Sequence, residues 1–217
     1  MVRSEFDRIK RTIGEIPIAI ERLYSALGKD DLVALLTYSL LPEEWIEGRD
    51  ERMYARKAAE HVDKGGFSLF VVPSDKLRKR CPLLDLQSPA TDAWFESFDA
   101  FVQRVKKVST GDGDPAKQIA FATTEIPLFL APGHKYILFM HKDDAYAMGY
   151  FPCGPGSSSP YEPSYTARLF LPLTGEIVDA LFQIMKKAVK TQLDEASAEQ
   201  REALQAILER LECPRGD

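Results

Sequence analysis

The sequence predicts an α/β fold in which a mixed β-sheet is flanked by helices, with an N-terminal helix and a C-terminal helical pair. Three observations predict this fold. Two apolar runs enclose a helical segment between residues 31 and 73, which is typical of a parallel βαβ unit. Several shorter apolar runs, separated by turn residues, follow between 118 and 173. The last part of the chain carries two apolar stripes at helical spacing.

The chain divides into three expected parts: an N-terminal helical segment at 1–28, an α/β domain at 29–192 and a C-terminal helix at 193–217. Apolar residues recur at intervals of three and four in the first part, as in an amphipathic helix or a short coiled coil. These residues are Phe6, Ile9, Ile13, Ile16, Ile20, Leu23 and Leu27. Gly28 is suited to end the helix. The apolar stripe can pack on its own domain or mediate self-association, and the sequence leaves both alternatives open.

The first half of the α/β domain contains two predicted buried strands and two predicted helices. The strands are DLVALLTYSLLP and FSLFVVP. A helix over about 50–64 lies between them and ends at Gly65 and Gly66. The second helix, SPATDAWFESFDAFVQRVKKV, places its large apolar residues on one face. The polar segment STGDGDP then forms a loop.

The second half of the domain contains further predicted strands, and the chain ends in helices. The strand-like runs are QIAFATT, IPLFLA, YILFMH, AYAMGYF and ARLFLPL. The segment PCGPGSSSPYEPSY, before the last of them, predicts a long irregular loop. Ser197 and Gln200 fit a capping box that begins the last helix. The two helical stripes consist of Ile177, Leu181, Ile184, Met185 and Ala188, and of Leu204, Ile207, Leu208 and Leu211.

Composition narrows the class of protein. The chain has 217 residues, of which 45% are hydrophobic and 28% charged, as in an ordinary globular domain with a core. A net charge of -5 and a pI near 5.4 argue against a dedicated nucleic-acid binder. We see no secretory signal and no apolar run long enough for a bilayer, and the three cysteines lack metal-ligand spacing. We therefore expect a cytoplasmic protein without a membrane or nucleic-acid partner.

The tetrapeptide HKDD at 141–144 combines residue types that are used in phosphoryl transfer, in which an imidazole attacks phosphorus and a lysine holds its oxygens. Apolar residues nevertheless run up to Met140 and resume at Ala145. This placement favours the turn of a β-hairpin, where aspartate is common. We therefore predict that the four charges are solvated turn residues.

His134 lies at the start of the strand KYILFM, beside a glycine turn. From here the chain reads HKYILFMHKDDAYAMGYF, then the long loop, ARLFLPL and TGEIVDALFQIMKKAVK. This order of elements resembles the second part of a phospholipase D-type half-domain, and LVALLTYSLLP and FSLFVVP resemble its earlier strands. The resemblance covers roughly residues 30–190. In that superfamily a His-x-Lys motif opens a strand, a turn with aspartate follows, and the next strand ends in a small-residue motif.

The chain departs from the family pattern HxKxxxxD. Lys135 follows His134 directly and therefore points to the opposite face of the strand. Tyr136 takes the lysine position, His141 takes the aspartate position, and Gly149 and Tyr150 replace the downstream small-residue motif. The resemblance therefore implies a degenerate member without phosphodiesterase activity, similar to the effector-sensing domains of some bacterial regulators. It also implies a homodimer, because a single half-domain of this fold normally pairs with a second.

A cleft for a small anionic ligand, or for a protein partner, is the binding site that we expect. Its candidate residues are His134, Tyr136 and Tyr150, with the loop 152–164 as a cover. A basic loop, DKLRKR, directly follows the strand FSLFVVP, and ligands in open α/β sheets bind beyond the carboxyl ends of strands. The loop can hold a phosphate or nucleotide, or it can be a solvated loop. Its cations are Lys76, Arg78, Lys79 and Arg80.

The sequence is also compatible with two other classes of protein and with a metal site. A phosphodiester or nucleotide hydrolase could use His134 as nucleophile or base, and an interaction or immunity-type protein would need no small-molecule site. The three histidines at 61, 134 and 141 could bind a metal together with Asp143 or Asp144, but their spacing does not demand it. We expect no catalytic residue, no metal and no cofactor.

Overall fold

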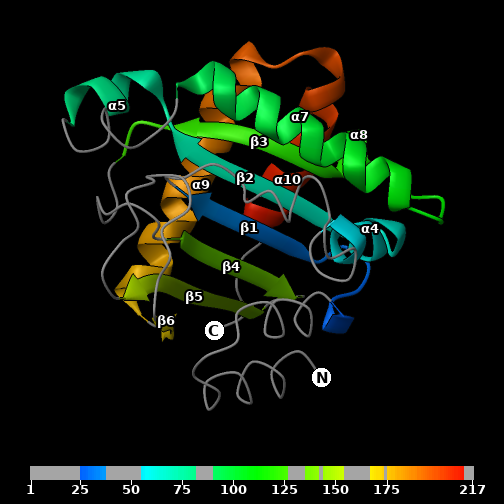
Figure 1. Ribbon diagram of the computed structural model, residues 1–217, viewed down its shortest axis with the longest axis horizontal. Coiled ribbons are helices and arrows are strands. Elements are labelled where there is room, and N and C mark those ends of the chain that lie inside the picture. Colours follow the sequence, from blue (N-terminus) through cyan, green and yellow to red (C-terminus); the bar gives the residue numbers. More distant parts are fainter. Residues whose placement is uncertain are drawn as a thin grey trace.

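The computed structural model describes residues 25–37, 55–81, 90–126, 135–141, 144–153, 167–173 and 175–212. In this part of the chain, six strands form one mixed sheet in the order β3-β2-β1-β4-β5-β6 (Figure 1). The predicted α/β class is confirmed. The strands are β1 (Leu32–Thr37), β2 (Phe67–Pro73), β3 (Ile119–Thr124), β4 (Lys135–His141), β5 (Asp144–Cys153) and β6 (Ala167–Leu173).

The first three strands form the parallel half of the sheet. Leu32 of β1 lies opposite Phe67 of β2, and Pro73 at the end of β2 lies opposite Thr124 at the end of β3. The helix α4 (Ala55–Asp63) connects β1 to β2, which confirms the predicted βαβ unit. These strands are apolar at nearly every position because helices cover both of their faces.

The last three strands form an antiparallel meander that continues the sheet from β1. Lys135 at the start of β4 lies opposite Thr37 at the end of β1, and Met140 lies opposite Leu32. His141 lies opposite Asp144 in the turn to β5, so the predicted hairpin at HKDD is confirmed. β5 then pairs with β6.

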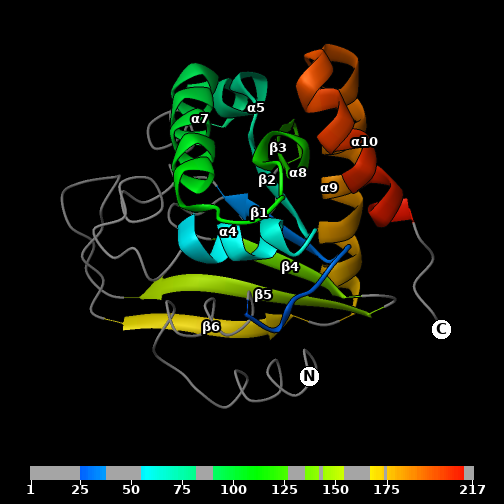
Figure 2. The same cartoon turned by 90° about the vertical axis from the view of Figure 1, so that its right-hand side faces the viewer.

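Helices cover both faces of the sheet, and Figure 2 shows the three layers. α4, α5 and α7 lie on one face, and the C-terminal pair lies on the other. The short helix α8 leads into β3. The remaining bounds are α5 (Asp75–Arg80), α7 (Thr91–Val108), α8 (Pro115–Gln118), α9 (Glu176–Glu195) and α10 (Ala198–Glu212).

Each face of the sheet builds its own apolar layer, because successive strand residues point to opposite faces. On the α7 face, Phe70 and Phe121 of the sheet contact Phe98 of α7 edge-on or tilted, at centroid distances of 6.0 and 5.3 Å. On the opposite face, side chains of all the first four strands pack with α9 and α10 in one continuous cluster. Both C-terminal helices therefore share a core with the sheet.

Two predicted details are wrong and one is confirmed. The basic segment DKLRKR is the helix α5 and not a loop, because Ser74 accepts a hydrogen bond from the Leu77 N–H at 3.1 Å and caps it. Ile177 was expected in the apolar stripe of α9 but is exposed, whereas the other four members are buried. The predicted cap of α10 is present, since Ser197 Oγ accepts from the Gln200 N–H at 3.4 Å.

Several predictions concern residues outside the described ranges. These are the helix expected within 1–24, the strand IPLFLA beyond Ile126, and the loop at 154–164.

Candidate functional site

The sheet has two edges with different polar chemistry. We call the edge where β1, β2 and β3 begin the amino edge, and the edge where they end the carboxyl edge. β4 runs antiparallel to β1, so it begins at the carboxyl edge and ends at the amino edge with His141.

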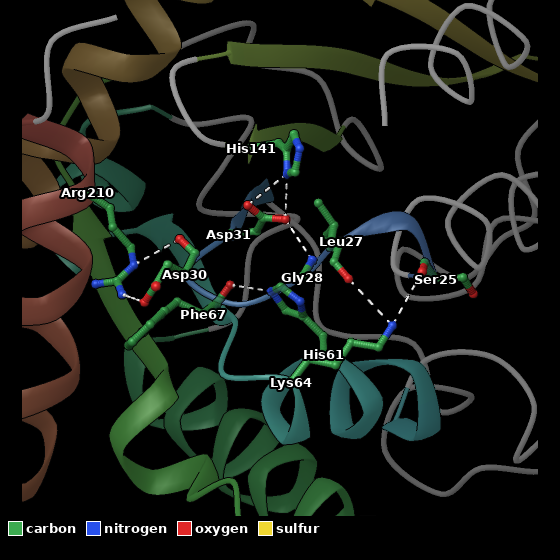
Figure 3. A network of polar contacts seen from close by, with 10 residues as sticks. All are labelled: Ser25, Leu27, Gly28, Asp30, Asp31, His61, Lys64, Phe67, His141 and Arg210. Atoms are coloured by element: carbon green, nitrogen blue, oxygen red, sulfur yellow. Dashed lines mark hydrogen bonds and ion pairs between the residues drawn. The ribbon is translucent and has the colours of Figure 1, made fainter. Parts of the chain in front are cut away.

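At the amino edge a buried aspartate forms hydrogen bonds with two neighbouring residues (Figure 3). Asp31 is only 3% exposed, and its Oδ2 accepts a hydrogen bond from the Gly28 N–H at 2.7 Å. Nδ1 of His141 lies 2.8 Å from the same oxygen and 3.0 Å from Oδ1. A buried carboxylate is costly unless donors compensate it, and these two donors do so.

His141 therefore differs from its prediction as a solvated turn residue. The register that places Met140 opposite Leu32 brings His141 beside Asp31, although 110 residues separate them in sequence. The imidazole is partly exposed, and an ionised carboxylate can only accept, so the proton facing Asp31 is on Nδ1. The contact orients the ring and joins the β4–β5 turn to the start of β1.

His61 lies on the other side of Asp31 and is fully buried at the end of α4. Its Nε2 donates to the carbonyl of Phe67 at 3.1 Å. Burial lowers the pKa of His61 from 6.5 to about 4, against the smaller opposing effects of this hydrogen bond and of the Asp31 charge. The side chain is therefore a neutral donor at physiological pH.

The turn after α4 fits closely around this imidazole. Gly65 has a φ of 83°, in the left-handed region, and its carbonyl accepts from the Asp30 N–H at 3.0 Å. A Cβ at Gly66 would lie 2.0 Å from Cε1 of His61. Gln118 completes the enclosure, since its side-chain amide donates to the carbonyls of Val62 and Gly66, each at 2.9 Å. The sequence predicted the turn but not its contact with His61.

The C-terminal helix is fastened to the same edge by Arg210. Its Nη2 lies 2.6 Å from Oδ1 of Asp30, its Nε donates to the carbonyl of Asp30 at 3.1 Å, and its guanidinium stacks 3.6 Å above the ring of Phe67. The contact joins residues 180 positions apart. At the amino edge, side-chain contacts thus connect the starts of β1 and β2 with the end of β4 and with α10.

The carboxyl edge carries the helix α5 and most of the predicted ligand residues. Arg78 lies 3.4 Å from Oδ1 of Asp75 and is directed to its own helix. Partial burial raises the pKa of Asp75, but the hydrogen bonds from Thr91 and Arg78 and the charge of Arg78 outweigh it, so the net shift is downward. Lys79 and Arg80 are exposed. Within the basic segment, Arg78 is therefore engaged by its own helix, whereas Lys79 and Arg80 face solvent.

A group of cations acts on Glu125, the residue that follows β3; we call Lys76, Arg80 and Lys187 the cation cluster. Nζ of Lys76 lies 2.9 Å from each carboxylate oxygen of Glu125. This hydrogen bond from Lys76, together with the charges of Lys76, Arg80 and Lys187, holds the pKa of Glu125 below its ordinary value. Lys187 belongs to α9, so the cluster combines helices from both faces of the sheet. Sequence reasoning missed Glu125 and Lys187, because only the fold brings them to α5.

The other predicted site residues have different positions. Tyr136 is fully buried in the core beneath α9 and α10. Tyr150 lies in β5 opposite Lys135. His134 lies outside the described residues, but the next residue, Lys135, is at the carboxyl edge beside Thr37. β4 therefore starts at the same edge at which β2 leads into α5, with β1 between them.

No three histidine, cysteine, aspartate or glutamate side chains in the described ranges come together as metal ligands. None of the helices in that part of the chain has the length and apolar character needed to cross a bilayer.

Comparison with known proteins gives no assignment. A scan against models of protein families, a search of curated proteins and a search of solved structures each found no match to the chain.

Proposed function

We propose that the protein is a non-catalytic ligand-sensing domain of the degenerate phospholipase D-like kind, which binds a small anionic ligand at the carboxyl edge. The observation that carries the proposal is the cation cluster of Lys76, Arg80 and Lys187 beyond the ends of the parallel strands. Open α/β sheets bind ligands at this edge. The basic helix and the start of β4, next to His134, lie there together.

The order of elements supports the phospholipase D-like part of the proposal. Strand, helix, strand, helix and strand are followed by a hairpin, a further strand and an amphipathic helix. This is the order that the resemblance implies, and the hairpin occupies the place of the family's motif.

The position of Tyr136 supports a non-catalytic role. In the family's pattern a lysine two residues after the nucleophilic histidine holds the phosphate. Here that position is Tyr136, whose ring is buried in the core and cannot take this role from within it. Lys135 is the adjacent residue and alternates to the other face of β4. An anion would therefore be bound by α5 and α9 rather than attacked at β4.

A thermal-shift series tests the proposal. Inorganic phosphate, nucleotides and sugar phosphates are added at constant ionic strength, with chloride as the reference. We expect one of these anions to raise the Tm by several degrees, because a ligand that binds only the folded state stabilises it by mass action. The double variant Arg80→Ala/Lys187→Ala loses the shift, whereas Lys107→Ala, an exposed lysine on α7, keeps it. The proposal is contradicted when the double variant and Lys107→Ala show equal shifts in Tm, or when no anion raises the Tm of the unaltered protein.

The proposed sensor is a homodimer, because a single half-domain of this kind pairs to complete its cleft. Sedimentation velocity on the same samples gives the mass. A monomeric mass at micromolar concentration contradicts the dimer. It does not decide ligand binding, which the thermal-shift series tests separately.

A further inference from the structure

Lys76 of the cation cluster forms an ion pair with Glu125. Both oxygens of the carboxylate lie 2.9 Å from Nζ, so Glu125 presents two acceptors to one ammonium group. The two side chains are 57% and 49% exposed. An exposed pair of this kind contributes little to stability and is easily opened.

The backbone holds Glu125 at this position even though its side chain is exposed. The carbonyl of Thr124 accepts a hydrogen bond from the Ser74 N–H at 2.9 Å, immediately before α5. Oγ1 of the same threonine accepts from the Ile126 N–H at 3.1 Å. Thr124 is buried at the end of β3, and the next residue, Glu125, lies beside Lys76. The carboxylate is therefore presented to the cations by a fixed end of β3.

The neighbouring charges indicate which kind of ligand the cluster favours. Arg80 from α5 and Lys187 from α9 act on the same carboxylate. Lys76 and Arg80 are four residues apart on α5 and so lie on one side of that helix, and together with Lys187 they outnumber the single carboxylate. A phosphate group offers more negative charge and more acceptor oxygens than a carboxylate, so it is the better partner for three cations.

We infer that Glu125 is an internal stand-in for the ligand: it occupies the cation cluster in the empty protein and is displaced when a phosphate monoester or inorganic phosphate binds to Lys76, Arg80 and Lys187. The inference rests on the proposed function and adds the ligand's chemical class and a residue that sets its affinity. Because the carboxylate competes with the ligand, its removal strengthens binding.

The test compares Glu125→Gln with the unaltered protein by isothermal titration with inorganic phosphate and, separately, with adenosine monophosphate. Gln keeps the shape of the side chain and removes its charge. We expect the Kd for both compounds to fall about fivefold, because the variant has no exposed ion pair to open before the ligand binds. Glu209→Gln on α10 is the matched control, since it removes one exposed carboxylate near the other edge and leaves the Kd unchanged.

The outcomes separate the inference from the proposed function. Tighter binding by Glu125→Gln than by the unaltered protein, lost again when Lys187→Ala is added, supports the stand-in role. A gain for both compounds assigns recognition to the phosphate group, and a gain for the nucleotide alone overturns that assignment. Binding by the unaltered protein that Glu125→Gln weakens or leaves equal overturns the inference and leaves the sensor intact. Phosphate binding by neither protein overturns the anion site itself.

Discussion

The two edges of the sheet carry similar residue types in opposite physical settings. At the amino edge the carboxylate of Asp31 is buried and is shared by a backbone amide and an imidazole. At the carboxyl edge the carboxylate of Glu125 is half exposed, pairs with the ammonium group of Lys76, and is influenced by the charges of Arg80 and Lys187. A buried charge is expensive to separate from its partners, whereas an exposed pair exchanges partners readily. The amino edge is therefore suited to holding the fold, and the carboxyl edge to binding.

The largest effect is expected at the turn that encloses His61. Gly66→Ala places a methyl group 2.0 Å from a buried imidazole carbon, so the ring or the turn must move. We expect the free energy of unfolding to fall by about 3 kcal/mol, measured by urea denaturation. Gly28→Ala is the control at the same edge, because its added Cβ approaches Asp31 Oδ2 only to 3.9 Å. Equal stabilities of the two variants would show that the turn is less tightly packed than described.

A pH effect of similar size is expected from His61. The folded protein binds a proton there only near pH 4, whereas the unfolded chain binds it near pH 6.5. Between these values the unfolded state holds more protons, so stability decreases as the pH falls from about 6.5 to 4. The contribution of this single group amounts to about 3 kcal/mol at the acid end.

The measurement is a series of urea unfolding curves at several pH values for the unaltered protein and for His61→Gln, whose side-chain amide can still donate to Phe67. We expect the difference between the two stabilities to shrink as the pH falls. Two profiles that remain parallel would exclude His61 as the buried titrating group.

The smallest effects come from matched deletions of one cation at each edge. Arg210→Met removes a guanidinium that is 21% exposed, stacks on Phe67 and pairs with Asp30, and we expect a loss of about 1 kcal/mol. Lys76→Met removes a cation that is more than half exposed, and we expect an unchanged Tm in the absence of ligand. Differential scanning calorimetry of both variants measures this contrast. Similar losses would remove the distinction between a structural edge and a binding edge.

Much of the fold could be predicted, because its patterns are local. The βαβ unit, the amphipathic helix α7 and the C-terminal pair followed from apolar periodicity, and the structure confirms them. The helix α5 was mistaken for a loop, although Ser74 and Asp75 form a recognisable helix start. The prediction of a loop relied on the four cations of the segment and not on this helix start. The burial of Leu77, which stabilises the helix, cannot be deduced from the segment alone.

The sequence by itself determined most of the described strands, turns and helices, with α5 as the exception, and that a basic segment follows the second strand. It did so because periodicity and turn chemistry act between near neighbours. Only the tertiary structure decided that His141 binds Asp31, that Arg210 binds Asp30, and that Lys187 joins α5 around Glu125. These partners are brought together by strand register and helix packing. The residue type at either position carries no information about the other, so chain folding alone establishes which charges are buried and which remain available.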